Sequence, residues 1–186
     1  DSGLGGLTVL KSLEKIMPNE SFIYFGDTAH VPYGNKSTET IIQYSKNIID
    51  FFLDHNVKAI VIACNTVSAV AFKILSVNYK ISLFDVVCPA VSFANQASNT
   101  RNVGVIGTHA TINAKAYTEA FNNINSDCSI FEVPCPLLVP IIEEGWANSA
   151  VSKNITKIYL DSFNKTNIDT LILGCTHYPI MSNVIK

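Results

Sequence analysis

The chain has 186 residues, of which 48% are hydrophobic, so it is long enough to bury a substantial core. Thirteen basic and fifteen acidic residues give a formal net charge of -2, which argues against the basic surface of a nucleic-acid-binding protein. No apolar run approaches the roughly 20 residues that span a membrane, and no signal peptide opens the chain, so we expect no membrane partner and a cytoplasmic location.

Taken in chain order, short apolar runs alternate with longer segments of helical period. Helices are expected over residues 7–17, closed by Pro18, and over residues 38–53, entered through Ser37 as an N-cap. Strands are expected at residues 21–25, 58–63, 82–87, 103–106, 129–133 and 170–173. Most of these strands are apolar throughout, which is typical of buried parallel strands. The pattern therefore predicts an α/β fold with mainly parallel sheets flanked by helices.

The two halves of the chain resemble each other. Residues 58–66 (Lys-Ala-Ile-Val-Ile-Ala-Cys-Asn-Thr) are similar to residues 169–177 (Asp-Thr-Leu-Ile-Leu-Gly-Cys-Thr-His). Upstream, residues 1–5 can be aligned with residues 107–111 at a similar offset. Matches in the same order predict a duplicated unit with two pseudo-symmetric lobes and an active site in the cleft between them. We place the lobes at residues 1–98 and 99–186, with the boundary in the polar segment 98–102.

The five cysteines are odd in number and widely spaced, which favours reduced thiols over a disulfide framework. No Cys-x-x-Cys or His-x-x-x-His pair is present, so neither a metal site nor a cofactor is expected. Cys88, Cys128 and Cys135 have no counterpart in the other half, and we expect them to be structural, although the Pro-Cys-Pro context of Cys135 could place it near the cleft.

Cys64 and Cys175 form the matched pair. Each follows an apolar strand and precedes a predicted helix, where open parallel sheets bind their ligands. A single cysteine there is commonly just a small buried hydrophobic residue. Two thiols in matched turns could instead reach a substrate carbon from opposite faces, as inversion of that carbon requires. A helix N-terminus favours the thiolate, which is the form that removes protons.

Four motifs stand out along the chain: Asp1-Ser2-Gly3 with Gly5-Gly6, Pro32-Tyr33-Gly34, Ala63-Cys64-Asn65-Thr66, and Gly174-Cys175-Thr176-His177-Tyr178-Pro179. Together they resemble the motifs of the glutamate racemases, a branch of the aspartate/glutamate racemase superfamily. They occur in the family's order and cover almost the whole chain. The resemblance implies a cofactor-independent isomerase that interconverts L-glutamate and D-glutamate by two-thiol proton transfer. It further implies a supply of D-glutamate for bacterial peptidoglycan synthesis, and hence for cell-wall biogenesis and cell shape. A homodimer is an expectation that the sequence leaves open.

By the same resemblance, Cys64 and Cys175 are the proton acceptor and donor, and they exchange these roles with the direction of reaction. Asp1 would assist Cys64, and His177 with a nearby glutamate would assist Cys175. Of Glu143 and Glu144 we favour Glu144, although either could lie on a solvated helix face. The implied substrate-binding residues are Asp1, Ser2, Tyr33, Gly34, Asn65, Thr66, Thr176 and His177, with Thr108 and Thr111 adding contacts from a Gly-Thr-x-x-Thr turn.

Arg101 is the only arginine and lies outside every motif, so an arginine clamp on the substrate is not expected. Substrate carboxylates would instead be held by backbone amides at Gly34 and the loop-to-helix turns, together with hydroxyl and amide side chains. Without the resemblance, Asp1 could be a turn residue and His177 a buried imidazole with a structural hydrogen bond.

The sequence departs from the family at both ends. It begins at Asp1, where the family has a preceding apolar strand, and it stops soon after the Cys175 turn, so we expect a truncated chain with an incomplete second lobe. Two alternatives stay open: an aspartate racemase or other two-cysteine isomerase or decarboxylase of the superfamily, and a catalytically silent binding or redox module. Assays with both enantiomers of glutamate and aspartate separate these possibilities.

Overall fold

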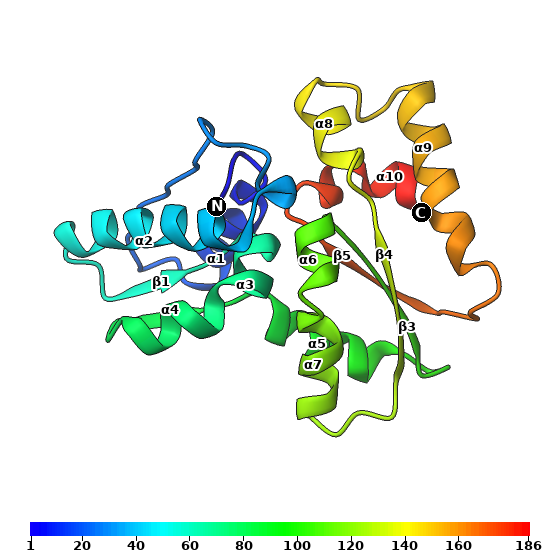
Figure 1. Ribbon diagram of the computed structural model, residues 1–186, viewed down its shortest axis with the longest axis horizontal. Coiled ribbons are helices and arrows are strands. Elements are labelled where there is room, and N and C mark those ends of the chain that lie inside the picture. Colours follow the sequence, from blue (N-terminus) through cyan, green and yellow to red (C-terminus); the bar gives the residue numbers. More distant parts are fainter.

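The computed structural model describes all 186 residues, which form two α/β lobes lying side by side (Figure 1). The elements of the first lobe are α1 (Leu7–Ile16), a 3-10 turn at Tyr33–Asn35, α2 (Thr38–Asp54), β1 (Ala59–Val61), α3 (Asn65–Val70), α4 (Phe72–Asn78) and β2 (Ser82–Phe84). The elements of the second lobe are α5 (Val87–Ala97), β3 (Asn102–Gly107), α6 (His109–Asn113), α7 (Ala116–Asn123), β4 (Ser129–Pro134), α8 (Leu138–Glu143), α9 (Ala150–Leu160), β5 (Thr170–Gly174) and α10 (Ser182–Ile185). Two further 3-10 turns occur at Asp161–Phe163 and Tyr178–Met181.

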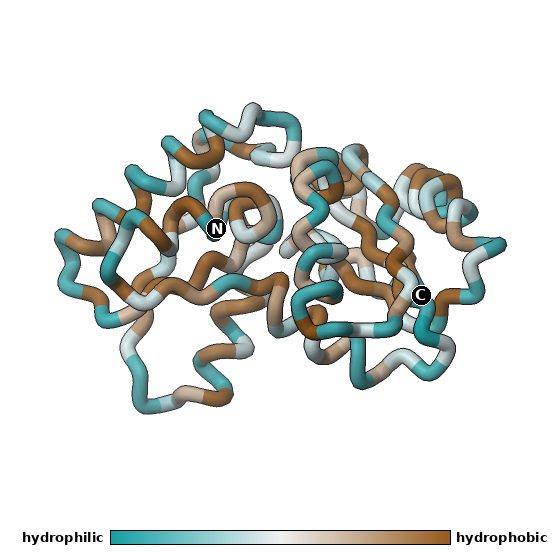
Figure 2. Tube along the Cα trace, turned by 60° about the horizontal axis from the view of Figure 1, so that its bottom comes forward, coloured by the Kyte–Doolittle hydropathy of each residue, from teal (hydrophilic) through white to brown (hydrophobic).

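All strand pairs are parallel. β1 pairs with β2 in the first lobe, and the second lobe has the order β4-β3-β5. Residues 103–107 of the central strand β3 are all buried, because neighbouring strands and helices cover both faces. The tube in Figure 2 shows hydrophobic segments running through the middle of each lobe and hydrophilic segments gathered at the periphery. The predicted α/β class with parallel sheets is confirmed.

Local sequence signals explain several helix starts. Ser37 caps α2 as expected, since its side chain accepts a hydrogen bond from the backbone N–H of Thr40. The predicted strand over residues 82–87 is too long, because β2 ends at Phe84 and Asp85 begins the turn into α5. The Asp85 carboxylate accepts hydrogen bonds from the N–H groups of Val87 and Cys88 at 2.6 and 2.7 Å.

The strand predicted at residues 21–25 is wrong. These residues form no strand ladder. Their backbone instead leads into contacts with the first residue: the Asp1 nitrogen donates to the Phe25 carbonyl at 2.9 Å, and Asp27 N–H donates to the Asp1 carbonyl at 3.0 Å. β-Branched and aromatic side chains gave this segment its strand signal, but a strand also needs a partner along its length.

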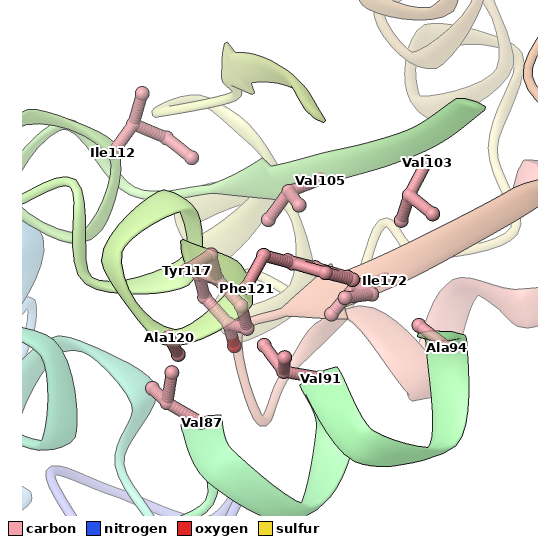
Figure 3. Packing of buried hydrophobic residues seen from close by; sticks show 10 residues of the cluster. All are labelled: Val87, Val91, Ala94, Val103, Val105, Ile112, Tyr117, Ala120, Phe121 and Ile172. Carbon is pink, nitrogen blue, oxygen red and sulfur yellow. The ribbon is translucent and has the colours of Figure 1, made fainter. Parts of the chain in front are cut away.

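The boundary between the lobes lies earlier in the chain than residues 98–102. Helix α5 precedes that segment, yet its residues Val87, Val91 and Ala94 belong to the same buried cluster as Val103 and Ile172 of the second sheet (Figure 3). By packing, the chain changes lobe between β2 and α5. Residues 98–100 are instead a turn tied to the second lobe by Asp169 at the entrance to β5.

Candidate active site

The two sheets direct Cys64 and Cys175 into one pocket. Cys64 follows β1 and is the N-cap residue of α3, while Cys175 follows β5 directly. Both side chains are buried, and both line the same pocket between the lobes. Eight of the predicted substrate-binding residues also line it: Ser2, Tyr33, Gly34, Asn65, Thr66, Thr108, Thr176 and His177. The structure therefore brings together most of the residues singled out from the sequence.

Asp1 and Thr111 lie behind the pocket lining. The Asp1 carboxylate accepts a hydrogen bond from Gly3 N–H at 2.9 Å and one from the Thr176 hydroxyl at 3.2 Å, so it joins the first lobe to the second. Thr111 is fully buried, and its hydroxyl lies 3.0 Å from that of Thr108 and 3.2 Å from that of Thr66. Both residues therefore hold side chains that face the pocket.

A hydroxyl group is the hydrogen-bond partner of the Cys64 thiol. Its Sγ donates to the Ser2 Oγ over 3.6 Å, and Ser2 is itself buried. Asp1 does not hydrogen-bond the thiol, but it precedes Ser2 in the chain and fixes the loop from which Ser2 projects. On the Cys64 side the structure thus presents a thiol next to a buried hydroxyl.

An imidazole lies next to the Cys175 thiol, and a carboxylate lies on the far side of that imidazole. Cys175 Sγ lies 3.8 Å from Nδ1 of His177, and Nε2 of the same ring lies 2.5 Å from Oε1 of Glu143. The expected Glu144 is wrong, because the side chain that reaches His177 is that of Glu143, and Glu144 makes no side-chain hydrogen bond or ion pair. Glu143 is the last residue of α8 and Glu144 its C-cap, so the two adjacent side chains leave the helix in different directions.

Burial sets the protonation state of Cys175. It raises the pKa of the Cys175 thiol to about 12, against the opposing effect of the His177 and Tyr178 backbone N–H groups. Desolvation outweighs the turn's hydrogen bonds, contrary to the expectation that this turn favours a thiolate. A neutral thiol at this position is in the form that can donate a proton.

Two glycines let the lobes approach closely. A Cβ atom at Gly34 would overlap the side chain of Thr108 in the second lobe. A Cβ atom at Gly5 would lie 2.5 Å from the Thr176 hydroxyl oxygen and 2.9 Å from the Thr176 carbonyl carbon. Both glycines have ordinary negative φ values, so lack of space rather than backbone conformation requires them.

Several site residues were not predicted. Val31, Pro32, Asn35, Pro136 and Val139 also line the pocket, and the Val31-Pro32 peptide bond is cis. Pro32 carried a signal through the Pro32-Tyr33-Gly34 motif and Pro136 through the Pro-Cys-Pro motif, whereas the other three carried none.

The central Cys135 of that motif is fully buried in the core cluster of the second lobe and does not line the pocket. Asp27 was also missed. This buried carboxylate accepts a hydrogen bond from the Tyr33 hydroxyl at 2.5 Å and so fixes the loop that carries Tyr33 and Gly34.

No group of three or more His, Cys, Asp or Glu side chains is arranged to hold a metal ion. None of the helices combines the length and hydrophobicity needed to cross a membrane.

Comparison with known proteins places this chain in a family. The pattern described as Asp/Glu/Hydantoin racemase matches residues 6–186. The chain belongs to this family. A glutamate racemase of Sulfurihydrogenibium sp. is 48% identical over 100% of the chain, which spans 72% of that relative's length.

Solved structures agree. A glutamate racemase from Francisella tularensis in complex with D-glutamate superimposes with a TM-score of 0.92 at 45% identity, covering 100% of this chain and 69% of that one. A Bacillus anthracis glutamate racemase gives a TM-score of 0.96 at 34% identity, covering 100% and 70%. Each of these matches covers the whole of this chain, including the turns that carry Cys64 and Cys175.

Proposed function

We propose that this racemase interconverts L-glutamate and D-glutamate, with Cys64 and Cys175 as acid/base groups on opposite sides of the substrate α-carbon. The observation that carries the proposal is that the two thiols, 111 residues apart in the chain, line one pocket from different lobes. A single base could only remove and return a proton on one face. Two opposed thiols can remove a proton from one face and add one to the other.

The proton balance is simple. The thiolate of one cysteine takes the α-proton, and the thiol of the other donates its proton to the opposite face of the resulting carbanion. Each turnover leaves the two cysteines with exchanged protonation states, so the reverse reaction uses the same groups in exchanged roles. The neutral Cys175 thiol, which burial favours, suits the direction in which Cys175 is the donor.

Glutamate is the proposed substrate because the similar proteins are named glutamate racemases and one of their structures holds D-glutamate. The pocket lining fits a small zwitterionic acid, since hydroxyls of Ser2, Thr66, Thr108 and Thr176 line it together with the Asn65 carboxamide. Arg101 does not take part, because its guanidinium donates to the Asn95 carbonyl outside the pocket. Aspartate, which is one methylene shorter, is the alternative substrate.

We extend the proposal to the biological setting. A D-glutamate-forming enzyme would act in the cytoplasm and supply D-glutamate for peptidoglycan synthesis, as the family resemblance implies. A homodimer stays a prediction, which analytical ultracentrifugation of the full-length protein would test.

The test is circular dichroism of glutamate incubated with the full-length protein. We expect the signal of either enantiomer to decay to zero, with aspartate racemised at least about tenfold more slowly, because one methylene in a pocket changes discrimination by 10-fold or more. Activity should survive dialysis against a chelator and treatment with borohydride. Loss after either treatment would contradict cofactor-independent chemistry, and faster turnover of aspartate would assign the alternative substrate.

A further inference from the structure

Tyr117 is a fully buried residue of α7 with no part in the proposed acid/base chemistry. Its ring packs with Phe121, Val91 and Ile172 in the core between the second sheet and α5 (Figure 3). A tyrosine hydroxyl buried in such a core needs a hydrogen-bond partner, because burying it unpaired is energetically unfavourable. Where the hydroxyl finds that partner is therefore informative.

The partner belongs to the other lobe. Asn65 donates from Nδ2 to the Tyr117 hydroxyl oxygen at 2.8 Å. Asn65 directly follows Cys64 at the start of α3, is buried, and lines the pocket. A buried phenol of the second lobe thus holds the carboxamide next to the first cysteine.

The same phenol lies beside the second cysteine turn and leaves little room for a side chain there. A Cβ atom at Gly174, which precedes Cys175, would lie 3.2 Å from the ring carbon Cε2 of Tyr117 and 3.4 Å from its hydroxyl oxygen. Tyr117 therefore stands between the turn of Cys64 and the turn of Cys175, hydrogen-bonded to Asn65 and close enough to Gly174 to crowd any side chain there.

The orientation of Asn65 follows from this contact. A carboxamide has one donor end and one acceptor end, and here the donor end is held by Tyr117. The acceptor Oδ1 makes no hydrogen bond with the protein and belongs to a side chain that lines the pocket. An acceptor in this pocket is suited to the ammonium group of an amino acid, which is a donor only.

We propose that Tyr117 is a positioning residue that orients the Asn65 carboxamide, so that Oδ1 receives the substrate ammonium group. The inference rests on the proposed amino-acid racemase function and adds to it the group that recognises the amine. Tyr117 does not itself exchange protons with the substrate, since burial raises the pKa of its phenol far above neutrality.

The experiment compares Tyr117→Phe with the unchanged full-length protein, with glutamate racemisation measured in both directions. Phenylalanine keeps the ring and its packing but removes the acceptor that holds Asn65. We expect KM to rise about tenfold in both directions with kcat changed less than about threefold, because an ammonium contact made equally in ground and transition states affects binding alone. Tyr159→Phe, which alters a partly exposed tyrosine of the same lobe outside the pocket, should leave both constants unchanged.

A double-mutant cycle with Asn65→Ala shows whether Tyr117 acts through Asn65. We expect the double variant to match Asn65→Ala alone, because the phenol has nothing to orient once the carboxamide is gone. The proposal would be overturned in favour of a packing role if the KM increases of the two single variants multiplied in the double variant. An unchanged KM in Tyr117→Phe, or loss of its folded state, would overturn it as well. Absence of racemisation in the unchanged protein would instead contradict the proposed function.

Discussion

Glu143 contacts His177 through the ring nitrogen remote from Cys175: Oε1 lies 2.5 Å from Nε2, while Nδ1 lies 3.8 Å from Cys175 Sγ. The carboxylate can accept only from a protonated Nε2, so it fixes the position of that proton and the plane of the ring. Nδ1 is then directed toward the thiol, where it can stabilise a thiolate if it carries a proton or accept the thiol proton if it does not.

This arrangement predicts different effects for two adjacent glutamates. Glu143→Gln should lower kcat for racemisation about tenfold or more, since a hydrogen bond to a charged group is worth about 1.5–3 kcal/mol. Glu144→Gln should stay within about twofold, because the Glu144 side chain does not bond His177. Steady-state kinetics on the two variants decide the point, and equal losses would show that Glu143 acts only through local structure.

The close contact at Gly34 gives a second prediction. Gly34→Ala should lower kcat/KM about tenfold, because the new methyl group would overlap Thr108 and hold the lobes apart, and overpacking costs about 1–3 kcal/mol. The added methyl group lies at the lobe contact rather than in a lobe core, so the melting temperature should change little. A variant with normal kinetics would mean that the first lobe can shift without disturbing the two thiols.

The sequence predicted the features that depend on local pattern. Apolar runs before Cys64 and Cys175 located β1 and β5, and the matched turns indicated a shared pocket that the structure contains. Features that depend on three-dimensional neighbours could not be predicted from the sequence. Nothing in the Glu143-Glu144 pair shows which side chain reaches His177, since the choice depends on where α8 ends. The lobe assignment of α5 likewise depends on packing against β5, which lies far along the chain.

The hydrogen bonds of Asp169 should make the stability of the second lobe depend on pH in acid. Its carboxylate accepts hydrogen bonds from the Ser98 hydroxyl and from the N–H groups of Asn99 and Thr100 at 2.6, 2.7 and 2.8 Å, and these bonds hold its pKa below the usual 3.8. A lowered folded-state pKa means that the stabilisation is fully present above the usual value and is lost as the pH falls through the folded value.

Asp169→Asn should therefore lower the melting temperature at neutral pH. The difference from the unchanged protein should shrink as the pH falls below 3.8. Thermal melts followed by circular dichroism between pH 7 and pH 2 would measure this, and a difference that stayed constant with pH would show that the carboxylate charge is not the cause. Asp161→Asn is a suitable control, because Asp161 is exposed and its side chain bonds only the exposed Asn164.

The division of labour between the two cysteines gives the last prediction. Cys64→Ser or Cys175→Ser should lower racemisation at least about 10²-fold, the usual scale for loss of a positioned acid/base group. Each variant keeps one thiol on one side of the pocket, so chemistry that needs a single face should survive in part. From the family resemblance, we expect Cys64 to act on the D enantiomer and Cys175 on the L enantiomer.

A glutamate analogue carrying chloride on its β-carbon isolates that single-faced step. Once a thiolate removes the α-proton, chloride leaves the β-carbon and a carbon-carbon double bond forms, with no need for a proton from the second face. Cys64→Ser should then eliminate chloride from the L analogue and fail with the D analogue, and Cys175→Ser should show the opposite preference. Chloride release measured for both variants with both enantiomers tests this directly. Comparable rates in all four combinations, or wild-type racemisation in either variant, would mean that the matched cysteines are structural and that another pair of groups moves the proton.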